Sequence, residues 1–220
     1  KFDGYHFSPN MLDIYNPFSL LNTFKYNKFS NYWFETGTPT YLVELLKRTH
    51  YDLGRMAHVE TDADVLNSIY GDEDPIPVIF QSGYLTIKGY DKEFGLYRLG
   101  FPNKEVEEGF MKFLIPFYTR FNKVEAPFEI QRFVKELRAG DIDAFFKRLR
   151  SFFADTPYEL VSELELHYQN VLFILYKLLG FYVKAERHTS DGRIDLVLQT
   201  DKFIYIMEFK LDGTAEEALQ

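Results

Sequence analysis

The order of hydrophobic patterns in the last third of the chain limits its possible folds most. Apolar residues keep helical spacing from about residue 159 to Leu179, and Gly180 is a typical helix stop. Thr214 supplies an N-cap for another helix. Between them lie three shorter runs rich in β-branched and aromatic residues, at 181–187, 194–199 and 203–210. We therefore predict one long helix, three strands and the start of a second helix, an αβββα order.

Residues 1–80 are predicted to be mainly helical with loops, because helix start signals recur there. One start is Thr38-Pro39, which places proline at the first helical position. Asp62 or Asp64 is placed to cap a further helix, and the proline-containing segment DEDPIPV is expected to end it.

Residues 81–154 are predicted as a β-hairpin followed by helices. Tyr84, Thr86 and Lys88 alternate with Leu85 and Ile87, which is typical of a strand. Helical periodicity then covers 104–119, 129–139 and 142–153. The hairpin and the helix after it also permit a winged-helix-like unit that binds protein or DNA. Taken together, the chain is predicted to be α+β within the broad α/β class.

The last two of these helices carry basic residues for which two interpretations fit, a solvated surface or a surface that contacts DNA. The residues are Arg132, Lys135, Arg138, Lys147, Arg148 and Arg150.

Composition excludes several classes of protein. The hydrophobic fraction of 46% and aromatic fraction of 18% predict packed cores rather than disorder. The chain has no cysteine, which excludes disulfides and cysteine zinc sites and favours a cytoplasmic setting. No apolar run is long enough for a membrane helix, so no membrane partner is expected. The net charge of -8 argues against a protein that coats nucleic acid by bulk electrostatics.

Three charged residues on the last two predicted strands carry the chemistry. In an antiparallel hairpin that turns near Thr200 and Asp201, residues whose numbers sum to about 403 lie opposite each other, and Asp195 and Glu208 fulfil this condition. Lys210 shares the face of Glu208 by the period of two. Two carboxylates and an ammonium group on one face suit a divalent cation that acts on a phosphate. The alternative is that both carboxylates are strand-end residues in solvent.

The segments FDGYHFS, YNPFSLLN, YWFETGTPTYLVELLK, GRIDLV and EFKLDGTAEEALQ resemble a bacterial family abundant in gut anaerobes. Its members join an AAA-type ATPase-like domain to a C-terminal domain of the PD-(D/E)XK nuclease superfamily. The resemblance implies three parts: the helical end of the ATPase-like module at 1–80, a connecting region at 81–154 and an incomplete nuclease-like domain at 155–220. Ile194 stands where the superfamily motif has proline.

The resemblance also implies roles for individual residues. Asp195 and Glu208 would bind Mg²⁺ or Mn²⁺, and Lys210 would position water or stabilise charge. The long helix would add Glu165, or less favourably Glu163, with Gln169 on the same face. Gln220 stands where a family helix carries a polar residue near the site.

Two functional hypotheses follow. The first is a metal-dependent nuclease, with DNA favoured over RNA, regulated by the ATPase-like module; Arg187 and Arg193 beside the site are then candidates to contact nucleic acid. The second is an inactive nuclease fold that serves as a binding or regulatory module, which the net charge of -6 from Asp155 onward favours. The chain has no GxxxxGK[ST] phosphate loop, so no ATP binding is expected on it.

The chain begins with Lys rather than Met and ends in a helical pattern, so we expect a piece of a longer protein. The five histidines lack metal-ligand spacing and are expected to have packing or surface roles, with His188 the one placed to approach a phosphate.

Overall fold

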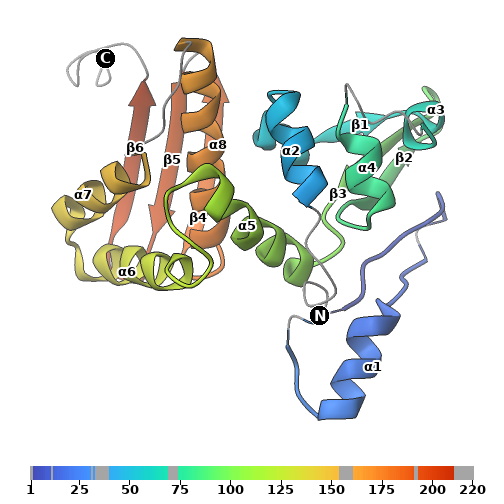
Figure 1. The fold of residues 1–220 in the computed structure, drawn as a ribbon, viewed down its shortest axis with the longest axis horizontal. Coiled ribbons are helices and arrows are strands. Elements are labelled where there is room, and N and C mark those ends of the chain that lie inside the picture. The colour runs from blue at the N-terminus through green and yellow to red at the C-terminus, as the bar shows by residue number, and fades with distance from the viewer. Residues whose placement is uncertain are drawn as a thin grey trace. The chain divides into compact units, whose positions relative to one another are not determined.

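The computed structural model describes residues 2–10, 12–30, 32, 40–68, 74–153, 161–190 and 193–210. These residues form eight α-helices and two three-stranded antiparallel sheets (Figure 1). Contacts divide the chain into two compact units, Lys1–Phe113 and Leu114–Gln220. The mixed helix and sheet fold expected from the sequence is confirmed. The three-part domain division stays a prediction.

Unit 1 surrounds the sheet of order β1-β3-β2. Its elements are α1 (Pro17–Tyr26), α2 (Thr40–Arg48), the 3₁₀ helix η2 (Leu53–Ala57), β1 (Val59–Thr61), α3 (Ala63–Leu66), α4 (Ile76–Gln81), β2 (Thr86–Asp91) and β3 (Leu96–Gly100). Helix α5 (Lys104–Tyr118) contains the division between the two units. Thr38 and Pro39, predicted to begin α2, lie outside the described residues.

Two elements of unit 1 differ from the sequence prediction. β1 was not expected, because a three-residue strand has little pattern of its own and pairs with a distant strand, Val59 opposite Leu99. Helix α4 begins within the segment DEDPIPV, which was expected only to break a helix. Pro75 and Pro77 occupy its start, where a missing N–H costs no helical hydrogen bond, and Asp74 Oδ1 accepts from Ile76 N at 3.0 Å.

The predicted hairpin is present as β2 and β3, but the expected alternation along β2 is wrong. Thr86 is buried along with Ile87, because the N-terminal segment covers it. His6 N donates to Thr86 Oγ1 at 2.7 Å, and Thr86 Oγ1 donates to His6 O at 2.9 Å. A polar side chain on this strand is therefore part of the interior, with its hydrogen-bonding capacity satisfied.

Unit 2 contains three helices that pack with the second sheet, whose order is β4-β5-β6 (Figure 1). Its elements are α6 (Ala126–Ala139), α7 (Ile142–Phe153), α8 (Val161–Leu179), β4 (Lys184–Ser190), β5 (Arg193–Gln199) and β6 (Ile204–Lys210). The predicted helix followed by three strands is confirmed, although β4 begins three residues later than expected. The predicted helix after Gly213 lies outside the described residues.

Helices α6 and α7 form an aromatic core. Phe145, Leu149 and Phe152 of α7 are buried, and the Phe133 ring of α6 meets those of Phe145 and Phe152 edge-on, at centroid distances of 5.1 and 5.0 Å. Gly140 ends α6 at φ +80°, a conformation that glycine adopts without strain.

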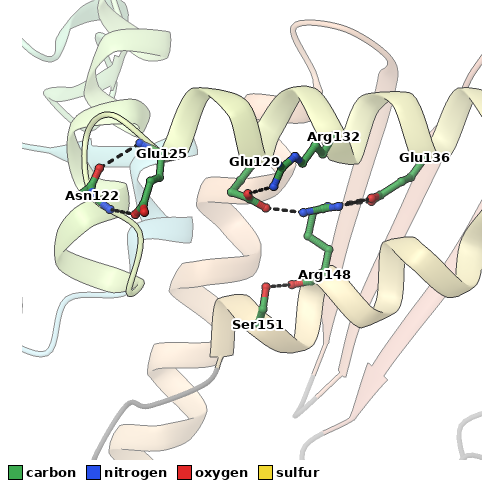
Figure 2. A network of polar contacts seen from close by, with 7 residues as sticks. All are labelled: Asn122, Glu125, Glu129, Arg132, Glu136, Arg148 and Ser151. Carbon is green, nitrogen blue, oxygen red and sulfur yellow. Dashed lines mark hydrogen bonds and ion pairs between the residues drawn. The ribbon is translucent and has the colours of Figure 1, made fainter.

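One of the basic residues on these helices has a structural role. Arg148 of α7 pairs with two carboxylates of α6, its Nε lying 2.9 and 3.0 Å from Glu136 Oε1 and Oε2 and its Nη1 bonding Glu129 (Figure 2). Hydrogen bonds from Arg148 to Glu136 raise the pKa of the guanidinium above its usual value. The solvated position is therefore wrong for Arg148, and a contact of these basic residues with DNA stays a prediction.

One face of the β4-β5-β6 sheet is covered by helices. Leu196, Leu198 and Met207 are buried on this face. Tyr205, on the same face, donates its hydroxyl to Leu137 O of α6 at 2.7 Å. The opposite face is open along β6, where Ile206 is 79% exposed and Ile204 is 65% exposed. The two faces therefore have different environments.

No helix in the described parts of the chain has the length and apolarity needed to span a bilayer.

Candidate functional site

Strands β5 and β6 bring the two predicted carboxylates into direct opposition. Asp195 pairs with Glu208 in the antiparallel register, which confirms the pairing derived from their spacing. The turn between the strands fixes this register, because Thr200 N donates to Phe203 O at 2.9 Å. Residues directly opposite in such a pair share a face, with Cβ atoms about 5 Å apart. This is close enough for two carboxylates to share one cation.

Both positions lie on the open face of the sheet. Glu208 alternates with the buried Met207, and Asp195 alternates with the buried Leu196, so positions 195 and 208 lie opposite the helix-covered face. Glu208 is half-buried, and its Oε1 atom is shielded from solvent. A carboxylate that is partly desolvated beside a second one is costly unless a cation or proton offsets the charge.

Lys210 lies at the next position of β6 on the same face, two residues beyond Glu208. Its register partner is Arg193 of β5, which in turn pairs with Ser190 of β4. In the register of β5 and β6, the paired positions 195 and 208 are therefore followed by the paired positions 193 and 210. The pairing of Arg193 with Lys210 obeys the same sum of 403.

His188 of β4 pairs with Asp195, so it completes a row of His188, Asp195 and Glu208 across the three strands. The sequence marked His188 as near the Gly192 turn but did not align it with Asp195. The missing signal was the register of β4, because the predicted strand at 181–187 ended before residue 188.

The two helical candidates, Glu165 and Gln169, lie on α8, which packs against β4. Gln169 is half-buried on this helix, whereas the side chains of Glu165 and Glu163 lie outside the described ones. Among the side chains that the structure does describe, no three His, Asp or Glu groups cluster as a metal site; those of Asp195 and Lys210 are not in that set. The contribution of Glu165 and Gln169 stays a prediction.

A cavity of about 800 Å³ lies in unit 1 and contains none of the predicted site residues. Its lining includes three acidic side chains, Asp52, Glu60 and Asp74, and three basic ones, Arg55, Lys88 and Arg98. The balanced charges give it no evident preference for an anion or a cation.

The register places the sequence positions of the predicted site on one face of the second sheet. Paired carboxylates suit a hard cation such as Mg²⁺, which takes one or two protein carboxylates plus water and phosphate oxygens. An adjacent cationic row suits the phosphate itself. Such a combination is typical of sites that hydrolyse phosphodiester bonds with the help of a divalent cation.

Comparison with known families agrees with this class. The PD-(D/E)XK nuclease superfamily matches residues 163–220, a range that includes most of α8 and the three strands with Asp195, Glu208 and Lys210. The match supports a PD-(D/E)XK nuclease superfamily domain over these residues.

A relative matches almost the whole chain. It is an uncharacterized protein from the vnfD 5′ region of Azotobacter chroococcum mcd 1, 33% identical over 223 residues. The match covers 96% of this chain and 42% of the relative. The chain therefore spans less than half the length of the relative. No solved structure matches the chain.

Proposed function

We propose that the chain carries the active site of a metal-dependent nuclease that hydrolyses phosphodiester bonds of nucleic acid, with DNA favoured over RNA. The observation that supports this most is the register of β5 and β6, which pairs Asp195 with Glu208 and puts Lys210 two residues further along the same face. The superfamily match over 163–220 supports the nuclease-type activity independently.

In this proposal, Asp195 and Glu208 hold Mg²⁺ or Mn²⁺ through carboxylate oxygens. The cation supplies charge for the phosphate and lowers the pKa of an attacking water. Lys210 stabilises negative charge on the phosphate or positions the water. Glu165 and Gln169 of α8 are proposed to support the same site from the side of β4.

Metal binding is the first test. Titration calorimetry with Mg²⁺ is expected to show a site in the wild type that Asp195→Asn and Glu208→Gln remove. Asp201→Asn is the matched control, because Asp201 is an exposed carboxylate in the β5–β6 turn. Mg²⁺ binding that survives Asp195→Asn and Glu208→Gln would rule out this metal site.

Nuclease activity is the second test and belongs to the full-length protein, because the relative extends well beyond the matched part. Incubation with DNA or RNA and Mg²⁺ or Mn²⁺ is expected to give cleavage that favours DNA. Glu208→Gln should reduce the rate by about 100-fold or more, whereas Glu186→Gln, an exposed carboxylate on β4, should not.

The alternative proposal is a binding or regulatory module that keeps the nuclease fold without activity. The net charge of -6 from Asp155 onward favours it, because an acidic domain repels nucleic acid. Metal binding without cleavage by the full-length protein would support this alternative. Regulation by an ATPase-like module is likewise a proposal, tested by whether ATP changes the cleavage rate of the full-length protein.

A further inference from the structure

The cavity of about 800 Å³ in unit 1 lies outside the proposed nuclease site, and its volume is within the range of small-molecule sites. Acidic and basic side chains line it in equal number, so a count of charges does not select a ligand. The two kinds of side chain differ, however, in whether the fold already supplies them with partners. That difference gives the cavity a preference.

The carboxylates of Asp52 and Asp74 are already bound by backbone donors. Asp52 Oδ1 accepts from the backbone N–H two residues further along the chain at 2.8 Å, and Asp74 Oδ1 accepts from the corresponding N–H at 3.0 Å. Lys88 also has a partner, because its Nζ donates to Pro102 O at 3.0 Å. These hydrogen bonds offset part of the charge that the three side chains bring to the cavity.

The arginines that line the cavity, Arg55 and Arg98, form no ion pair with any residue that the structure describes. Glu60 is the register partner of Arg98 in the β1–β3 pairing, yet it does not pair with the guanidinium. The guanidinium lies instead over Gly89 of β2, where an added Cβ would come within 2.5 Å of Nη2. Arg55 contacts only the face of the Tyr51 ring, at 6.0 Å from its centre. The positive charge is therefore the one that the fold leaves for a ligand.

We propose that this cavity binds a small molecule through a phosphate or carboxylate group, which Arg55 and Arg98 hold. A guanidinium presents a planar set of donors that bind two oxygens of either group at once. The volume of about 800 Å³ leaves room for a larger body attached to that group. The proposal is independent of the nuclease site, because Asp195 and Glu208 belong to the second unit.

A structural explanation competes with this proposal. The Arg98 guanidinium covers the backbone of β2 at Gly89, so its role would be to pack against the sheet. Gly89→Ala separates the two explanations. The added methyl group displaces the guanidinium and keeps its charge, and the group that moves is the far end of a flexible side chain, so the fold loses little.

The test measures binding of pyrophosphate and of citrate to the 220-residue chain by titration calorimetry at low salt without divalent cations. Pyrophosphate is the phosphate probe and citrate the carboxylate probe, and at least one is expected to bind with a Kd of about 1 mM or tighter. Arg55→Gln and Arg98→Gln should each weaken this binding about 10-fold. Lys92→Gln, the same loss of charge in the exposed turn between β2 and β3, should not weaken it.

Thermal melting of the same variants separates binding from packing. Gly89→Ala should weaken binding as Arg98→Gln does and keep the melting temperature of the wild type. The probe that binds more tightly assigns the phosphate or the carboxylate class. Absence of binding by both probes, an equal loss in Lys92→Gln, or unchanged affinity in Arg98→Gln and Gly89→Ala would overturn the proposal. A lowered melting temperature with unchanged affinity would assign Arg98 to packing instead.

Discussion

At the scale of single residues, the proposed function depends on the pairing of positions 195 and 208 of β5 and β6. Asp195 and Glu208 are opposed on one face, and Glu208 Oε1 is shielded from solvent. Two carboxylates at directly opposed positions are expected to repel each other when no cation is bound. A site that binds a cation needs this concentration of negative charge.

Asp195→Asn is therefore expected to stabilise the metal-free protein. Relief of the like-charge pair should raise the free energy of unfolding by about 0.5–1 kcal/mol. Urea denaturation in EDTA measures the change, and repetition with Mg²⁺ should stabilise the wild type but not the variant. A metal-free variant that is less stable than the wild type would indicate that Asp195 forms a structural ion pair instead.

Arg148 shows the opposite situation, a charge whose partners are built into the fold. Its side chain is 21% exposed, and those of Glu129 and Glu136 are 9% and 12% exposed. Arg148→Ala should lower the free energy of unfolding by about 3 kcal/mol, because it leaves two poorly solvated carboxylates without this cation. Urea denaturation measures the loss. Arg150→Ala, an exposed arginine on the same helix, should change stability by less than about 0.5 kcal/mol.

At the scale of elements, the junction of α6 and α7 depends on a glycine that has two separate roles. Gly140 has φ +80°, and a Cβ at this position would lie 2.8 Å from the Phe203 ring. Gly95, in the β2–β3 turn, has φ +71° but no atom within 4 Å of such a Cβ. The two glycines therefore separate backbone strain from steric contact.

Gly95→Ala is expected to lower stability by about 1 kcal/mol through backbone conformation alone. Gly140→Ala should cost more, because Phe203 must also move, and Gly140→Ala combined with Phe203→Leu should recover part of the difference. Thermal or urea unfolding of each variant provides the comparison. Equal losses for the two glycine variants would show that the Phe203 ring adapts without cost.

At the scale of the whole molecule, the division into two units predicts a local response to metal. Asp195 and Glu208 belong to the second unit, so Mg²⁺ should slow amide hydrogen exchange in β5 and β6. Strands β2 and β3 of the first unit should exchange at the same rate with and without Mg²⁺. Equal protection in both units would contradict a metal site confined to the second one.

The sequence distance between paired strands explains why some elements could be predicted from the sequence and others could not. The three C-terminal strands are consecutive, and a tight turn joins β5 to β6, so local patterns predict both the strands and the pairing of Asp195 with Glu208. By contrast, β1 pairs with a strand forty positions away, Val59 with Leu99. A pairing across that distance depends on the packing of the intervening chain, which no short pattern records.

The sequence by itself determined the helix followed by three strands and the register of the last hairpin, because turn length and side-chain period act over a few residues. Only the tertiary structure decided which face of the sheet stays open, that His188 joins the row of Asp195 and Glu208, and that Arg148 serves the fold. Each of these depends on segments that meet through packing, where burial and charge pairing are decided together.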